Sequence, residues 1–123
     1  MTHTMAMPVR VFERRAVREA VAYAQTGGIA LHFFRWSHPH FGTGEYCHVL
    51  SSDHDLLIEF GAAYGFPPHL LQPPRRGRGV WHFDAFGWRA IALRRLATKL
   101  TGDERNASAE RAEDAENTES GED

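Results

Sequence analysis

Residues 45–65 decide the fold, and they read EYCHVLSSDHDLLIEFGAAYG. The first six residues are rich in aromatic and apolar side chains and predict a strand. Two serines and Asp53 follow, and they supply the capping oxygens and the negative charge that favour the start of a helix. Apolar residues then recur at helical spacing as far as Gly65, which predicts the end of that helix. A strand followed directly by an amphipathic helix is therefore the centre of the predicted domain.

Further elements are predicted on both sides of this centre. Upstream, residues 9–24 predict an amphipathic helix, because their apolar and charged side chains fall on opposite halves at 100° per residue. Residues 29–35 predict a strand, and residues 36–44, which contain Pro and Gly, predict a loop. Downstream, residues 80–83 predict a third strand, and residues 85–100 predict a final helix, which Asp84 would cap.

This order of elements predicts an α+β domain, in which a small three-stranded sheet packs against helices in two layers. The strand–helix–strand run over residues 45–83 also predicts that the last two strands are parallel. We expect a flexible leader at residues 1–8, a single domain at residues 9–100 and a disordered acidic tail at residues 101–123.

The predicted tail differs in composition from the rest of the chain. It contains no Val, Ile, Leu, Met, Phe, Trp or Tyr, so it cannot bury enough apolar surface to offset the entropy of ordering. It carries nine acidic and two basic residues, whereas the rest of the chain carries seven acidic and twelve basic residues. Two interpretations stay open. The tail is either a solvated segment or a segment that folds back on the basic body and screens it from a polyanion.

Composition also bears on the cellular compartment. Cys47 is the only cysteine, so no disulfide forms within the chain, and a lone thiol is typical of a reducing compartment. No apolar run approaches the length that spans a bilayer, and no secretory leader is visible. We therefore expect a cytoplasmic protein that makes no contact with a membrane.

A series of short motifs runs in order along the chain. The run Tyr46-Cys47-His48-Val49-Leu50-Ser51-Ser52 precedes the acidic and apolar helix, and Leu71-Gln72, His82-Phe83-Asp84 and Arg89 follow it. Over residues 29–100 this order resembles a bacterial domain-of-unknown-function family (DUF 4031). The resemblance implies no activity, because that family is uncharacterised. Residues 31–35 lack the Asp that the family's first strand usually carries, and Ser52 stands where the family has an acidic residue.

His48, His82 and Asp84 form the main candidate site. Residues i and i+2 of a strand share a face, so His82 and Asp84 point the same way, and His48 lies on a neighbouring predicted strand. Two imidazoles and a carboxylate suit a divalent metal, which would polarise a phosphoryl or carbonyl group and activate water. Arg89, in the predicted last helix, would neutralise an anionic substrate.

A purely structural interpretation of the same residues stays open. Asp84 would then only cap the last helix, and His82 would pair with Asp84 or with the backbone. Helix capping likewise explains Ser51 and Ser52 without a nucleophilic role. Cys47 and His48 point to opposite faces of their strand, so His48 is poorly placed to activate the thiol.

The basic loop containing Arg75, Arg76 and Arg78 is the second candidate site. Arginine forks hold phosphate, and the nearby Trp81 would stack on a base. Two functions therefore follow from the sequence. The first is a metal-binding or metal-dependent domain that acts on an anionic small molecule through the His/His/Asp site. The alternative is a module that binds nucleic acid or another polyanion, or an accessory domain that docks on a protein through residues 9–24.

Overall fold

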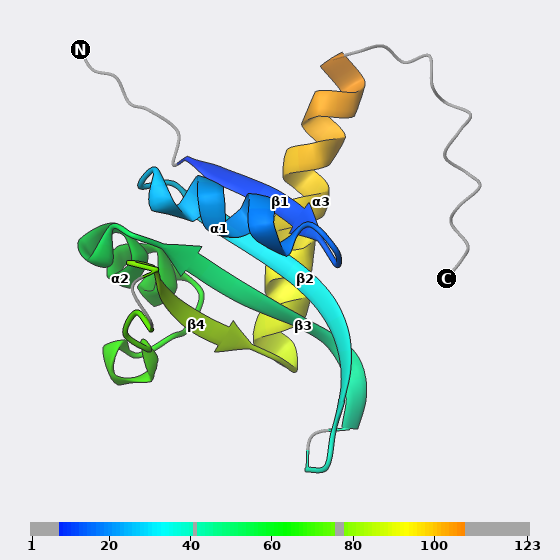
Figure 1. Ribbon diagram of the computed structural model, residues 1–123. Helices are drawn as coiled ribbons and strands as arrows, with labels where there is room; N and C mark the ends of the chain where they lie inside the picture. The colour runs from blue at the N-terminus through cyan, green and yellow to red at the C-terminus, as the bar shows by residue number, and fades with distance from the viewer. Residues whose placement is uncertain (1–7, 41, 76–77, 108–123) are drawn as a thin grey trace.

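The fold is a four-stranded mixed sheet with helices on both faces (Figure 1). The computed structural model describes residues 8–40, 42–75 and 78–107, with no side chains described from residue 103 onward. The elements in chain order are β1 (Val9–Glu13), α1 (Val17–Gln25), β2 (Ile29–His38), β3 (Gly42–Ser51), α2 (His54–Ala63), the 3-10 helix η1 (Pro68–Leu70), β4 (Trp81–Ala85) and α3 (Trp88–Ala107).

The sheet has the strand order β1-β2-β3-β4. β1 and β2 are parallel, whereas β2 and β3, and β3 and β4, are antiparallel. The α+β class is therefore confirmed, but the prediction of three strands is wrong, and so is the parallel pairing of the last two. After α2 the chain returns to the end of the sheet at which β3 finishes, so Trp81 begins β4 beside Ser51 and the strand runs back along β3.

Residues 9–24 form a strand and a helix rather than the single helix predicted. Val9 and Val11 alternate with Arg10 and Phe12, and this short β-branched run pairs in parallel with β2. A turn then leads into α1. The chain leaves this helix near Gly27, which adopts a positive φ of 101°. The prediction was wrong because β1 is only five residues long and its partner lies far along the sequence.

β2 and β3 continue through the stretch that was predicted to be a loop. Trp36 pairs with Gly44 and His38 with Gly42, so the glycines lie within or at the end of β3. β1 reaches only as far as Phe33, and β4 only as far as Cys47. Residues 34–38 and 42–46 therefore project beyond the rest of the sheet as a two-stranded hairpin arm, which Figure 1 shows clearly.

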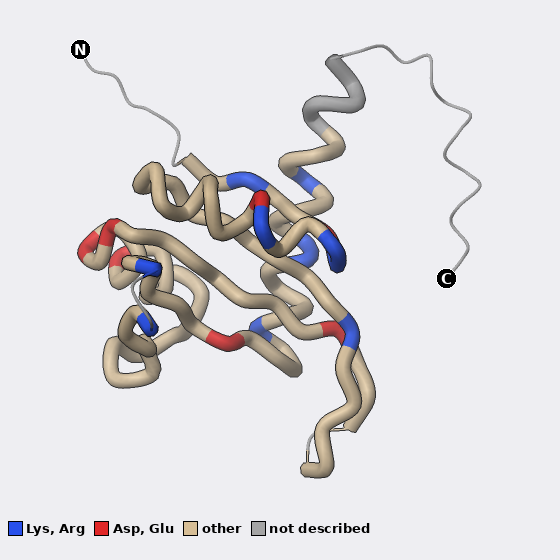
Figure 2. Tube along the Cα trace, in the orientation of Figure 1, with Lys and Arg blue, Asp and Glu red and all other residues tan. Residues whose placement is uncertain are grey.

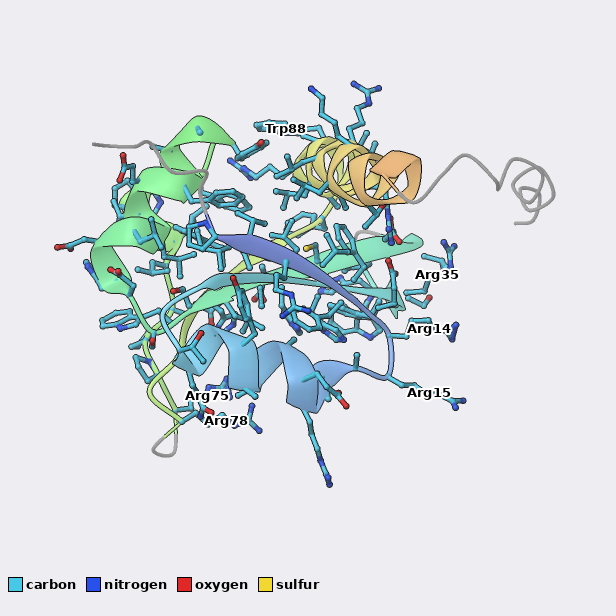
Figure 3. All side chains as sticks on the ribbon, turned by 90° about the horizontal axis from the view of Figure 1, so that it is seen from above. Arg14, Arg15, Arg35, Arg75, Arg78 and Trp88 are labelled. Atoms are coloured by element: carbon cyan, nitrogen blue, oxygen red, sulfur yellow. The ribbon has the colours of Figure 1, made fainter. Side chains whose placement is uncertain are left out.

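The sheet is covered differently on its two faces. On one face α2 and α3 bury the main core, which contains Leu31, Phe33, Val49 and Phe83. On the other face α1 covers Ala30 and Leu50 and forms a smaller apolar cluster. Seen from above, α1 lies on one side of the sheet and α3 on the other, so the predicted two-layer arrangement is wrong (Figure 3). On this face α1 packs on β1, β2 and β3 and makes few or no contacts with β4. The part of the face near β4 therefore stays open.

The last helix begins and ends later than predicted. It starts at Trp88, and Asp84 lies within β4, so Asp84 does not cap it. It continues to Ala107, through the first residues of the predicted tail, because a helix satisfies its own backbone whether or not it is buried. The rest of the predicted tail, residues 108–123, lies outside the described residues, as do residues 1–7 of the predicted leader. Within the described part of the chain, no helix has the length and apolar character needed to cross a membrane.

Gly61 of α2 lies at a close approach to the sheet and provides a test of core packing. A Cβ atom at this position would lie 2.6 Å from Cε2 of Phe83 and 3.3 Å from Cβ of Phe66. We expect Gly61→Ala to lower the free energy of unfolding by about 1–2 kcal/mol, because overpacking outweighs the gain in helix propensity. Urea denaturation measures this change.

The control for that substitution is Gly44→Ala. A Cβ atom at position 44 would meet nothing within 4 Å. We expect this variant to differ from the wild type by no more than about 0.5 kcal/mol. Equal destabilisation by the two substitutions would show that the contact with Phe83 is not the cause.

Candidate functional site

An open cleft of about 660 Å³ lies on the sheet face that α1 covers only in part. Val17 and Val21 of α1 line one side of it, and the polar groups of β3 and β4 line another. The loop before β4 adds Arg75 and Arg78, which Figure 3 shows on the same side of the sheet as α1. The cleft therefore combines an apolar wall, a polar region and a basic rim.

Three side chains predicted from the sequence meet in the polar region of this cleft. Nε2 of His82 lies 3.3 Å from Oδ1 of Asp84, and Nε2 of His48 lies 3.5 Å from the same oxygen. Alternation within β4 places His82 and Asp84 on one face, while Phe83 is fully buried on the other. The antiparallel register places His48 directly beside Asp84. The structural interpretation is wrong about the helix cap, because Asp84 lies within β4, but the pairing of His82 with Asp84 that it expected is present.

Gln72 holds the carboxylate in place and was not identified from the sequence as a site residue. Its Nε2 donates a hydrogen bond of 2.8 Å to Oδ2 of Asp84. Its backbone pairs with His82 through two hydrogen bonds, from Gln72 N to His82 O at 2.8 Å and from His82 N to Gln72 O at 3.0 Å. This isolated bridge fixes the amide beside the carboxylate. The motif Leu71-Gln72 marked the position, but the partner of Gln72 depends on tertiary structure.

The ionisation of the cluster follows from these contacts. The imidazole of His82 beside Asp84 lowers the pKa of that carboxyl, and burial only partly opposes this effect. Burial lowers the pKa of His48, although the Asp84 carboxylate acts in the opposite direction. At neutral pH the cluster therefore contains an ionised carboxylate and a neutral His48. Because an ionised carboxylate only accepts hydrogen bonds, it favours a proton on the Nε2 atom that faces it.

His32 extends the row of imidazoles onto β2 and was not predicted as a site residue. Its ring stacks on that of His48 with centroids 5.8 Å apart, and it is only 5% exposed. Its Nε2 lies 2.8 Å from the carbonyl oxygen of Arg14, so Nε2 carries the proton. Nδ1 is buried without a hydrogen-bond partner among the described residues. His32 pairs with His48 in the register of β2 and β3, which brings the two rings together. This pairing of residues was not predicted from the sequence.

Aromatic side chains of the hairpin arm form another wall of the cleft. Phe34 lies 4.6 Å from His48 between ring centroids, and it stacks on Tyr46 at 5.8 Å. Trp36 meets Tyr46 edge to face at 5.3 Å and is half exposed. The hydroxyl of Tyr46 donates a hydrogen bond to Gly42 O at 3.1 Å. This wall was not predicted, because Trp36 was expected to lie in a loop.

Arg89 lies away from the cleft, contrary to its predicted role. It donates two hydrogen bonds to the carbonyl oxygen of Gly65, at 2.9 and 2.8 Å, and its guanidinium lies over the rings of Phe66 and Trp88. These contacts belong to the face of the sheet that α2 and α3 cover. The later start of α3 changes where this side chain points. Of the predicted basic loop, Arg75 and Arg78 line the cleft, and Arg76 lies outside the described residues.

Two nucleophilic side chains near the cleft, those of Cys47 and Ser51, are buried. Cys47 is fully buried, and this burial raises the pKa of its thiol. Ser51 is also fully buried, and its hydroxyl accepts a hydrogen bond of 3.0 Å from the backbone N of Asp53. Asp53 in turn is the residue that caps α2, by accepting a hydrogen bond of 3.1 Å from Leu56 N. Neither Cys47 nor Ser51 presents a reactive atom to a ligand in the cleft.

The geometry gives no support to the predicted metal set of His48, His82 and Asp84. In the part of the chain that the structure describes, no group of three or more His, Cys, Asp or Glu side chains is arranged to hold a metal ion.

Comparison with known proteins does not indicate a function for this cleft. No family model, curated protein or solved structure matches this chain. The resemblance to DUF 4031 therefore stays a prediction.

Proposed function

We propose that the cleft binds an anionic small molecule and that His48 and His82 exchange protons with it. The observation that carries this proposal is the convergence of two imidazoles on one oxygen of Asp84, inside a cleft with a basic rim. A neutral imidazole beside an ionised carboxylate is suited to accept a proton, because the carboxylate stabilises the imidazolium that forms.

The division of charge within the cleft supports an anionic ligand bound at the rim. Asp84 is negative, so an anion would be repelled from its immediate surroundings. Arg75 and Arg78 are exposed side chains of the loop that precedes β4, and guanidinium groups bind phosphate and carboxylate in a bidentate manner. The acid–base groups and the charge-binding groups thus come from different parts of the cleft wall.

The proposal assigns the attacking group, where a reaction occurs, to the ligand or to water. Cys47 and Ser51 are both buried, so neither side chain is available for covalent catalysis. A histidine pair that moves protons fits a reaction in which a hydroxyl or water is activated and a leaving oxygen is protonated. A divalent metal, which the residue types alone predict, is not needed for these steps.

A small ligand fits the distribution of charge better than a polyanion does. Figure 2 shows Lys and Arg on several sides of the fold rather than gathered on one face. Arg94, which would belong to a polyanion face, is bound to Glu13 and Glu45. Non-specific nucleic-acid binding depends on several unpaired cations that neutralise phosphates together. A cleft with two arginines on its rim is more suitable for one anionic group.

Calorimetric titration with inorganic phosphate tests this proposal in chelator-treated protein. We expect saturable binding accompanied by proton uptake, because the negative charge of an anion bound at the rim of the cleft favours the protonated form of His48, whose pKa burial has lowered. Proton uptake is obtained by repeating the titration in buffers with different ionisation enthalpies. We expect the Arg75→Gln, Arg78→Gln double variant to bind at least about tenfold more weakly. We expect the His48→Gln, His82→Gln double variant to bind without proton uptake.

Arg95→Gln is the matched control, since Arg95 is an exposed arginine of α3 outside this cleft. Its affinity for phosphate should equal that of the wild type. Binding that is absent from chelator-treated protein and restored by Zn²⁺ would replace the metal-free proposal with a metal-dependent one. No saturable binding under either condition would overturn both.

A further inference from the structure

The hairpin arm carries an aromatic surface that the fold itself does not explain. Phe34 and Trp36 share a face of β2, and Tyr46 lies beside Phe34 on β3. Their rings form a continuous series from His48 to Trp36, with centroid separations of 4.6, 5.8 and 5.3 Å. This surface borders the same cleft as the histidine cluster. It therefore belongs to the site and not to the core of the domain.

Burial alone does not account for Trp36. On the face of the arm that borders the cleft, 50% of the Trp36 side chain is exposed, whereas Tyr46 next to it is only 6% exposed. The indole meets the rings of Tyr46 and His38 edge to face, with centroids 5.3 and 5.1 Å away, and its exposed part borders the cleft as an aromatic surface. Planar ligands stack on such surfaces, and nucleobases do so whatever their sequence, because every base has a π-face.

The remaining groups of the cleft complement the rest of a nucleotide. The basic rim offers two guanidinium groups for a phosphate. The amide of Gln72 and the carboxylate of Asp84 are partly exposed polar groups, suited to hydrogen bonding with a sugar hydroxyl or the edge of a base. The volume of about 660 Å³ lies within the range of about 300–1,000 Å³ that is usual for small-ligand sites.

From these observations we infer that the anionic ligand is a nucleoside monophosphate whose base stacks on Trp36 of the hairpin arm. The inference rests on the proposed function, since it names the ligand class of the same cleft. It adds one feature that the proposed function does not require, namely a contribution of the base to affinity through the arm. A single nucleotide is favoured over a nucleic-acid strand, because Arg75 and Arg78 are the arginines of the described residues that line the cleft, and two guanidinium groups suit one phosphate.

Titration calorimetry with adenosine 5′-monophosphate and ribose 5-phosphate separates these contributions. We expect the nucleotide to bind about tenfold more tightly than the sugar phosphate, as one base–aromatic stack provides. In the Trp36→Ala variant we expect the nucleotide to bind no better than ribose 5-phosphate, whose own affinity stays unchanged. Trp36→Phe should restore part of the difference.

Trp88→Ala is the matched control, because Trp88 is 61% exposed and lies on the opposite side of the sheet (Figure 3). Its preference for the nucleotide should equal that of the wild type. Equal affinity of the wild type for the two ligands would overturn the inference but leave the proposed function standing. Failure of phosphate, sugar phosphate and nucleotide alike would overturn both. Binding of an eight-nucleotide RNA that is far tighter than binding of the nucleotide would assign the arm to a nucleic-acid strand instead.

Discussion

Replacing Arg94 by alanine is expected to lower the free energy of unfolding by about 2–3 kcal/mol. The guanidinium bonds Glu13 at 2.9 and 3.0 Å and Glu45 at 3.0 and 2.6 Å. It also lies 3.9 Å from the ring centroid of the fully buried Phe33. One side chain of α3 therefore joins the end of β1 to β3, on either side of β2. Its removal would leave two carboxylates without the cation between them.

The magnitude of this effect depends on how far water screens the cluster. Arg94 and Glu45 are each 33% exposed and Glu13 is 58% exposed, so the loss is smaller than the 3–5 kcal/mol that breaking a fully buried pair costs. Two bidentate contacts and a ring below the guanidinium nevertheless make the cluster stronger than an ordinary surface pair. The carboxylates raise the pKa of Arg94, in agreement with a stabilised charge.

Urea denaturation of Arg94→Ala, Arg94→Lys and Arg95→Ala measures the contribution. Lysine keeps the charge but cannot form the two forked contacts, so we expect it to recover less than half of the loss. The exposed Arg95 is adjacent in sequence, and its removal should change stability by less than about 0.5 kcal/mol. Similar stabilities of Arg94→Ala and Arg95→Ala would contradict the structural role of the cluster.

The parts of the site that the sequence predicts are those that follow from local periodicity. The i, i+2 spacing alone places His82 and Asp84 on one face and Phe83 in the core, and the structure has this arrangement. The proximity of His48 followed from the expectation of a neighbouring strand. It holds although the direction of β4 was predicted wrongly, because the face of a strand does not depend on the direction of its partner.

The parts that were missed depend on pairing between distant residues. β1 is stabilised by parallel pairing with β2, and Gln72 reaches Asp84 only through its bridge with His82. Trp36 was assigned to a loop because the glycines that follow were interpreted as turn residues, whereas Gly44 lies within β3. Arg89 was assigned to the site because α3 was expected to begin at residue 85. In each case the local sequence pattern was not sufficient, because pairing with a residue distant in the sequence decided which structure formed.

Acidification is expected to destabilise the protein in two stages, and His48 is responsible for the first. Burial lowers the pKa of His48 in the folded state, and the like charges of His82 and His32 act in the same direction. Between the unfolded value of about 6.5 and the lower folded value, the unfolded chain binds more protons, so stability falls as pH falls through this window. The lowered pKa of Asp84 gives a second loss, which begins only near its unfolded value of about 3.9.

Substitutions at the two positions separate these stages. We expect His48→Gln to abolish the loss of stability that begins below about pH 6.5 and to retain the loss near and below about pH 4. Asp84→Asn should do the reverse. It removes the contribution of Asp84 to the acidic stage, so that stage becomes smaller, and it widens the first stage, because the carboxylate that raises the pKa of His48 is gone. Urea midpoints measured at intervals between about pH 7.5 and about pH 3 provide the test.

Direct titration of the imidazole signals by NMR links this behaviour to the proposed chemistry. A neutral His48 at neutral pH is what allows it to accept a proton from a bound ligand, so the stability profile and the ligand-linked proton uptake should arise from the same group. We expect the titration midpoint of His48 to lie below about 6.5 in the free protein and to rise when phosphate binds. A midpoint well above neutral pH in the free protein would remove His48 as the base, because the residue would then already carry its proton when the ligand arrives.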